Sequence, residues 1–268
     1  MASGAVVKLD QWRRGAGTAL SFAIFGIGGL AIGLLISPLL HLGIRNRDRR
    51  QHVARHLIQR LFQVFIAIMK GLGVLDYRLT NVECLQRPGQ LVLANHPSLI
   101  DVVFLLAHTP NAACIVKGKL ASNPFTRGPI RVAGYITNRD PEAVLDAAQA
   151  SLARGESLIL FPEGTRTTPG RPIKFRRGAA NIALRTEAPI TPVLIDCTPT
   201  TLTKGDPWYH IPESRVMMSL HILDELPTTA SSSLPRAQQA RQLTRELSDY
   251  FNEELERLYN ERNTTAIA

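Results

Sequence analysis

A run of 24 residues, 19–42, contains no Asp, Glu, Lys or Arg, and it constrains the fold of this chain more than any other feature. The 19 residues that precede Pro38 would extend about 28 Å as a helix, close to the thickness of a bilayer's hydrocarbon core. A cleaved signal peptide fits poorly, because no small-residue cleavage site follows and the next segment is densely basic. The run therefore predicts a retained membrane-anchoring segment.

Basic residues flank this run unevenly. Only Lys8, Arg13 and Arg14 precede it, whereas four arginines between residues 45 and 50 follow it and lead into an amphipathic stretch at 52–69. If the run spans the bilayer, the positive-inside rule places everything after it in the cytoplasm. A re-entrant hairpin broken near residues 38–43 would place both of its ends there. Both alternatives predict a domain on the cytoplasmic face of the inner or cell membrane.

Short strand-like and helix-like runs alternate after residue 73, which is typical of an α/β sheet covered by helices. We therefore expect a single mixed β-sheet flanked by helices, with an N-terminal two-helix membrane motif. The expected strands lie near 75–82, 90–94, 112–117, 133–137, 157–161, 190–196 and 215–222, and the expected helices near 99–107, 141–153 and 175–187.

Three further segments complete the organisation. Residues 197–214 are rich in Pro and Thr and predict a long loop that can form a wall of the site, and TTASSS at 228–233 predicts a linker. After Pro235, apolar residues at helical spacing predict an amphipathic closing helix. The expected parts are thus a membrane anchor (1–72), an α/β domain (73–227), and a linker with a terminal helix (228–268).

Composition restricts the class of partner. The net charge of +9 and the pI near 9.9 favour an acidic partner, but aromatic residues make up only 6% and no nucleic-acid motif is present, so we expect no nucleic acid. The three cysteines, Cys84, Cys114 and Cys197, are predicted to be core thiols in a reducing compartment. No metal site is expected, because the helical pair His52 and His56 has no carboxylate or thiol beside it.

His96 follows the apolar strand QLVLA, at the carboxyl end where α/β sheets commonly bind ligands, and Asp101 comes five residues later. One interpretation of Asp101 is a capping box in which Ser98 is the N-cap. The other is catalytic: Asp101 accepts a hydrogen bond from one imidazole nitrogen, so that the other nitrogen can remove a proton from a hydroxyl. The two roles are compatible.

A second polar group follows the strand SLILF. In FPEGTR (161–166), Pro162 and Gly164 shape a turn, Glu163 supplies a carboxylate, and Arg166 supplies a planar fork suited to phosphate. Further bases follow at Lys174, Arg176 and Arg177, before a predicted helix that opens at Gly178. This group predicts a phosphate site.

Four motifs, NHPSLID, GYITNR, FPEGTR and APITPV, in this order, resemble the four blocks of the glycerolipid acyltransferase family, whose type member is 1-acylglycerol-3-phosphate acyltransferase. The resemblance covers about residues 75–225, and residues 19–70 resemble the family's two-helix membrane motif. It implies that His96 is the base, that Asp101 orients it, and that the residues matching the later blocks bind substrate. Those are Arg139, Glu163, Gly164, Arg166 and Pro192 with Val193, together with Lys117 from an upstream pattern and Lys174.

The resemblance implies an O-acyltransferase without a cofactor, which uses acyl-CoA or acyl carrier protein as donor, a lysophospholipid as acceptor, and membrane lipids as surroundings. Ala133, Asn138 and Lys119 depart from the family pattern. The changes at 138 and 119 make the region more positive, which leaves open a different lyso-lipid acceptor, such as a lyso-ornithine lipid, or transacylation from a phospholipid. A hydrolase is disfavoured because no G-x-S-x-G elbow occurs. A non-catalytic basic membrane adaptor would explain the net charge of +9, but it would give His96 and Asp101 no function.

Overall fold

The computed structural model describes residues 4–228 and 234–267. Within them lies a mixed seven-stranded sheet, ordered β1-β7-β6-β2-β5-β3-β4. All neighbouring strands are parallel except β6 and β7. The strands are β1 (Leu75–Thr80), β2 (Leu91–Ala94), β3 (Ala112–Lys117), β4 (Ile136–Asn138), β5 (Ser157–Leu160), β6 (Ile190–Thr198) and β7 (Val216–Ile222). The predicted sheet is confirmed, and the carboxyl ends of β2 to β6 share one edge.

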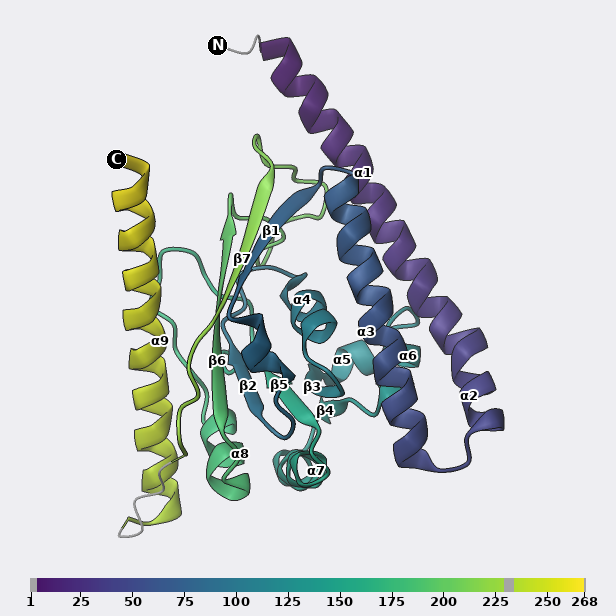
Figure 1. Cartoon of the computed structure of the whole chain (residues 1–268), viewed down its shortest axis with the longest axis vertical. Helices are drawn as coiled ribbons and strands as arrows, with labels where there is room; N and C mark the ends of the chain where they lie inside the picture. Colours follow the sequence, from purple (N-terminus) through teal and green to yellow (C-terminus); the bar gives the residue numbers. More distant parts are fainter. Residues whose placement is uncertain (1–3, 229–233, 268) are drawn as a thin grey trace.

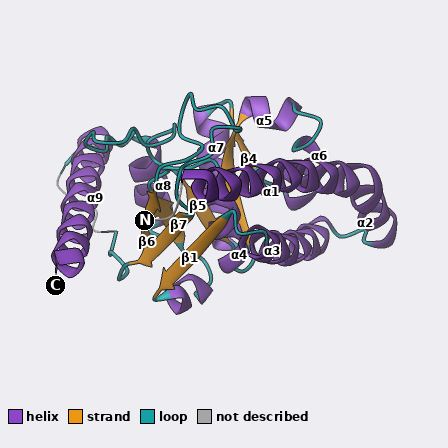
Figure 2. Cartoon of the chain, turned by 90° about the horizontal axis from the view of Figure 1, so that it is seen from above, coloured by secondary structure: helices purple, strands orange, loops and turns teal. Residues whose placement is uncertain are grey.

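Helices cover both faces of this sheet (Figures 1 and 2). On one face, α3 (Arg47–Gly71) and α4 (Asp101–His108) pack against Val92 and Ala94 of β2. On the other face, α7 (Pro141–Ala153), α8 (Gly178–Thr186) and α9 (Arg236–Ile267) pack against Leu91 and Leu93. Because β2 is buried on both faces, its sequence is a continuous apolar run rather than an alternating one.

The N-terminal segment forms a helical hairpin. Its first arm consists of α1 (Gly4–Ala31), a π-helical turn (Ile32–Ile36) and α2 (Ser37–Gly43), and its second arm is α3. The helix Lys8–Gly43 is long and apolar enough to cross a membrane by length and composition. It also lies along the α/β domain: a Cβ at Gly29 would come within 2.0 Å of the carbonyl oxygen of Phe125, so only glycine permits this approach.

Several boundaries differ from those predicted. Two short helices, α5 (Gly118–Ser122) and α6 (Arg127–Ala133), were not expected, and the strand expected at 133–137 begins only at Ile136. The reason is Gly134, whose φ of +67° terminates α6 in the left-handed region. The loop expected at 197–214 begins two residues later, because β6 extends through Thr198.

The closing helix is confirmed as α9, with Leu247, Phe251 and Leu255 buried against the sheet. Except for Thr228, the linker TTASSS lies outside the described residues. Cys114 and Cys197 are buried thiols, as predicted, whereas Cys84 is only half-buried.

Candidate active site

His96 lies two residues beyond the carboxyl end of β2, in the turn that leads to α4. Its ring stacks on Phe161, with the centroids 4.1 Å apart, and its side chain is 18% exposed. Nδ1 lies 2.8 Å from Oδ2 of Asp101. Among the described residues, no group hydrogen bonds to Nε2, so this atom is free to meet a substrate.

Asp101 is fully buried, and its Oδ2 accepts two hydrogen bonds, from the Ser98 backbone N–H at 2.8 Å and from the His96 ring. Burial raises the pKa of the Asp101 carboxyl, while these bonds and the charge of Arg166 oppose that rise. Its Oδ1 is buried without a partner, which adds to the cost of ionisation. When the Asp101 carboxyl is ionised it only accepts, so the proton of the neutral ring then lies on Nδ1 and Nε2 is the basic nitrogen.

The capping prediction is half wrong. The side chain of Asp101 does bind the Ser98 backbone N–H, but α4 begins at Asp101 itself and no side chain caps it. The Ser98 hydroxyl is buried and makes no hydrogen bond within the part of the chain that the structure describes. Asp101 therefore fixes the His96 turn and the imidazole together, through one oxygen.

Glu163 holds the backbone of the His96 turn. Its Oε1 accepts the His96 backbone N–H at 3.2 Å and the hydroxyl of Thr167. Thr167 in turn accepts the same His96 N–H at 2.9 Å, and its own N–H donates to the His96 carbonyl at 2.7 Å. Burial raises the pKa of the Glu163 carboxyl. Phe161 opens the FPEGTR motif and Thr167 directly follows it, but neither was predicted as a site residue.

Arg166 is half-buried beside this pair. Its Nη1 donates to the carbonyls of Leu202 at 2.6 Å and Thr203 at 2.9 Å, which lie in the loop after β6. The remaining guanidinium nitrogens make no hydrogen bond within the described residues, and the charge is close enough to lower the pKa of Asp101. The loop therefore forms a wall of the site.

Gly164 makes the close packing of the FPEGTR turn possible. It has a φ of +66°, and a Cβ there would lie 3.0 Å from Nε of Arg176. Lys174, Arg176 and Arg177 are exposed on the segment that follows. These bases give the neighbourhood of the turn a positive field.

Lys117 and Arg139 lie farther along the same edge. Lys117 ends β3 and pairs in register with Asn138, so the two bases follow adjacent strands, and Arg139 packs over Gly118. The order β2-β5-β3-β4 puts them two and three strand spacings from β2, or about 10 and 14 Å. Both side chains are exposed.

The structure does not bring Pro192 to the imidazole. Pro192 is buried within β6, in register with Leu93, and on the strand it alternates with Val193. It lies below the carboxyl edge, on the sheet face of Ile190 and Leu194.

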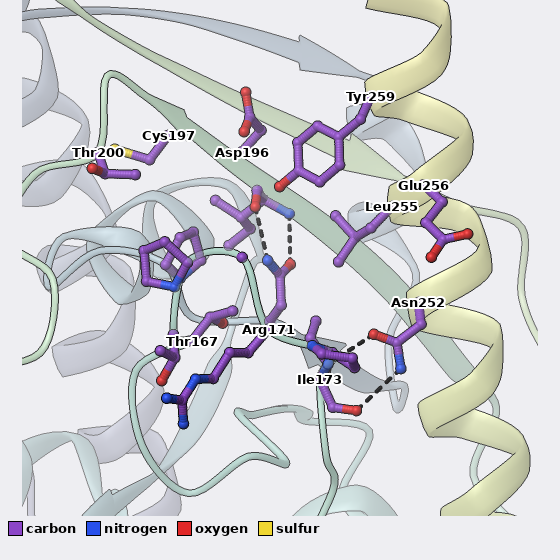
Figure 3. Close-up of a pocket in the computed structure, with 17 residues that line it drawn as sticks. Thr167, Arg171, Ile173, Asp196, Cys197, Thr200, Asn252, Leu255, Glu256 and Tyr259 are labelled. Atoms are coloured by element: carbon purple, nitrogen blue, oxygen red, sulfur yellow. Dashed lines mark hydrogen bonds between the residues drawn. The ribbon is translucent and has the colours of Figure 1, made fainter.

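A pocket of about 390 Å³ adjoins the back of the His96 turn, between residues 167–173, the end of β6 and α9 (Figure 3). Asn95 and Pro97 line it, while His96 does not. Asn252 of α9 pairs with the backbone of Ile173 through bonds of 2.7 and 3.1 Å, as Figure 3 shows. The closing helix thus fixes the segment that carries Thr167.

Within the described residues, no three His, Cys, Asp or Glu side chains gather into a possible metal site. His52 and His56 are both exposed on α3. Burial raises the pKa of Cys114 and of Cys197 to about 12, which keeps both thiols protonated and unreactive at neutral pH.

Comparisons with known proteins show what this chain is similar to. Residues 76–196 match the acyltransferase family model. Curated 1-acyl-sn-glycerol-3-phosphate acyltransferases from Cocos nucifera and from Helicobacter pylori strain J99 are 31% and 32% identical over 115 and 113 residues. Each alignment covers 40% of this chain, but only 37% and 48% of the relative. The chain therefore matches at most about half the length of these relatives.

The crystal structure of PlsC, the 1-acyl-sn-glycerophosphate acyltransferase of Thermotoga maritima, has the same fold. Its TM-score is 0.67 at 22% identity, over 93% of this chain and 98% of that one. The predicted resemblance is thus confirmed by sequence and by architecture. Residues 76–196 thus match the acyltransferase family model, and the chain is similar to 1-acyl-sn-glycerol-3-phosphate acyltransferases in sequence and to PlsC in fold.

Proposed function

We propose that this protein is a membrane-associated O-acyltransferase that moves a fatty acyl group from a thioester to a hydroxyl of a lysophospholipid such as 1-acylglycerol-3-phosphate. One observation carries the proposal: Asp101 orients the His96 ring through Nδ1, at 2.8 Å, while Nε2 has no partner among the described residues. This arrangement suits a general base.

In the proposed reaction, Nε2 of His96 takes the proton of the acceptor hydroxyl as the hydroxyl oxygen attacks the thioester carbonyl. The C–O bond forms, the C–S bond breaks, and the leaving thiolate takes the proton back from the imidazolium. The carboxylate of Asp101 stabilises the transient positive charge. Proximity of two amphiphiles can lower the barrier by about 7–11 kcal/mol in addition.

No covalent acyl-enzyme is required. The two buried cysteines remain protonated, and Ser98 is fully buried beneath the turn. Direct transfer is consistent with these positions.

The acceptor's phosphate is proposed to bind the free nitrogens of Arg166. Lys117 and Arg139 extend the positive field along the strand edge and are placed to attract the anionic donor, acyl-CoA or acyl carrier protein. Glu163 and Gly164 shape the turn rather than contact the acyl group. Lys174 adds to the field from outside the turn.

Membrane attachment is proposed to use the outer face of the first hairpin arm. Leu20, Ile27 and Leu34 recur at intervals of seven and are exposed, while Arg14 and Ser21 face inward and are buried. Because the inward face packs on the domain, we propose that this arm lies in one leaflet on the cytoplasmic side. A cysteine introduced near the N-terminus should then react from the cytoplasmic side with an impermeant reagent; reaction only from the opposite side would contradict this orientation.

The reaction is tested with purified protein, a panel of lyso-lipids and both thioester donors, followed by mass spectrometry of the products. His96→Ala should abolish transfer while the protein still folds and binds membrane. His108→Ala is the matched control, because His108 ends α4 and its ring binds only the Phe104 carbonyl. A fully active His96→Ala variant would rule out the base role.

The same panel identifies the acceptor. If a product forms only from a lyso-lipid that lacks a phosphomonoester, the proposed mechanism stands, but the acceptor is that lyso-lipid and not lysophosphatidate. If acyl transfer occurs from a phospholipid in the absence of a thioester, the acyl donor is the phospholipid and not a thioester.

A further inference from the structure

A second polar pocket, of about 550 Å³, lies where the membrane hairpin meets the α/β domain. It is lined by the end of α2, the start of α3, helix α6 and the first turns of α7. Its cationic lining residues are Arg47, Arg50, Arg127 and Arg131, and His41 lies beside them. We propose that this pocket binds the phosphate of an anionic phospholipid headgroup, at a site separate from the catalytic one.

The arginines of this pocket have no carboxylate partner. No Asp or Glu lines the pocket, and the side chains of Arg47, Arg127 and Arg131 make no hydrogen bond or ion pair with any described residue. Arg50 donates only to the carbonyl of Ile44. Cations gathered around one cavity repel each other, and a bound phosphate would relieve that repulsion through charge-assisted bonds.

The acidic residues of α7 near this pocket form ion pairs with an arginine outside it. Glu142 and Asp146 of α7 bind Arg185, which lies on α8. Asp48 follows Arg47 on α3, but it does not line the pocket. The positive charge of the pocket therefore remains uncompensated.

A buried amide also points to a ligand. Gln51 lines the pocket and is only 8% exposed, and its side chain makes no hydrogen bond with any described residue. It fits because residue 134 is glycine: a Cβ there would lie 2.3 Å from Nε2 of Gln51. Its amide atoms are not sealed within the protein and open onto the pocket, where a phosphate oxygen can accept the amide N–H.

The position of the pocket favours a lipid as the source of the phosphate. His41 lies in the last turn of the apolar arm, beside Leu39 and Leu42, which are 66% and 83% exposed. If these leucines enter the acyl region, the pocket lies at headgroup level. This step uses the proposed membrane placement, but it does not use the proposed reaction.

The test measures binding of short-chain phosphatidylglycerol to the full chain in zwitterionic detergent, by calorimetry, with short-chain phosphatidylcholine and inorganic phosphate as parallel probes. The Arg127→Ala/Arg131→Ala variant should bind phosphatidylglycerol about tenfold to a hundredfold more weakly. Gln51→Glu, which places a carboxylate in the pocket, should also weaken binding.

The control is Arg49→Ala/Arg60→Ala, which removes the same charge from exposed positions of α3 that do not line the pocket. Its affinity should stay near that of the wild type. An equal loss in this control would indicate general electrostatic attraction and overturn the site. Equal binding of phosphatidylcholine, or of inorganic phosphate, would overturn the lipid assignment. Because binding is measured without acyl transfer, a failure here is distinct from a failure of the proposed reaction.

Discussion

The most informative perturbation of the candidate site is Asp101→Asn, because it removes the charge of Asp101 and keeps its shape. Both hydrogen bonds of Asp101 converge on Oδ2, so an amide oxygen in that place can still accept the Ser98 N–H and the His96 ring N–H. The amide nitrogen would occupy the position of Oδ1, which has no partner among the described residues. An uncharged amide costs less to bury than a carboxylate, so the folded structure should be retained.

The expected loss of activity follows from the distance between the two groups. Nδ1 and Oδ2 are 2.8 Å apart, which places the centres of the imidazolium and carboxylate charges about 4 Å from each other. At an effective dielectric constant of about 20, their attraction is about 4 kcal/mol. This attraction exists only after His96 has taken the proton, so its loss should lower kcat by about a thousandfold with little change in KM.

The assay combines steady-state acyl transfer with thermal unfolding, and Asp101→Ala serves as the comparison. The alanine variant also leaves the Ser98 N–H buried and unpaired, which should destabilise the fold by about 1–3 kcal/mol, whereas the asparagine variant should unfold near the wild-type temperature. Wild-type kcat in a well-folded Asp101→Asn variant would refute the orienting role and reduce Asp101 to a structural residue.

Three further perturbations test other parts of the site. Burial raises the pKa of the Glu163 carboxyl above its ordinary value of 4.5. The protonated carboxyl therefore stabilises the folded state. This stabilisation is fully present at pH below 4.5 and is lost as the pH rises through the pKa of the folded state. Glu163→Gln should therefore gain unfolding free energy relative to wild type as pH rises; a difference constant with pH in urea titrations would contradict this. Arg166→Ala should chiefly raise the acceptor KM, and an unchanged KM would count against phosphate binding. Arg14→Ala should lower stability by about 1–3 kcal/mol, because it removes a buried guanidinium that donates to the backbone carbonyls of residues 212–214, whereas the exposed neighbour Arg13→Ala should change it little; similar unfolding temperatures for both variants would show that the contact is dispensable.

The order of strands and the short helices could not be predicted from local pattern. The alternation of apolar runs located seven strands, but neither the antiparallel pairing of β7 with β6 nor the position of β1 at the edge is encoded in any single run. Helices α5 and α6 have five and seven residues and are bounded by Gly and Pro, so no apolar period could develop. Helices α7 and α9 could be predicted because they are long enough for apolar residues to recur at helical spacing.

The candidate site was predictable wherever a residue follows a strand directly. His96 and Glu163 come after the parallel neighbours β2 and β5, whose carboxyl ends must meet at one edge. Pro192 was assigned by resemblance alone, and it lies inside a strand instead. Thr167 and the His96 turn are joined by hydrogen bonds between residues 71 positions apart in sequence. A local sequence motif does not reveal such a contact.

Arg14 connects the N-terminal helix α1 to the loop between β6 and β7. In the sequence Arg14 is one of three basic residues before the apolar run, but in the structure it is 1% exposed and donates to the carbonyls at residues 212–214. The same loop packs Trp208 on Phe22 of α1 and supplies the Leu202 carbonyl to Arg166. Because one loop contacts both the apolar helix and the arginine of the candidate site, we expect a displacement of α1 to shift the carbonyls that hold Arg166. Membrane insertion and the geometry around Arg166 are therefore expected to change together.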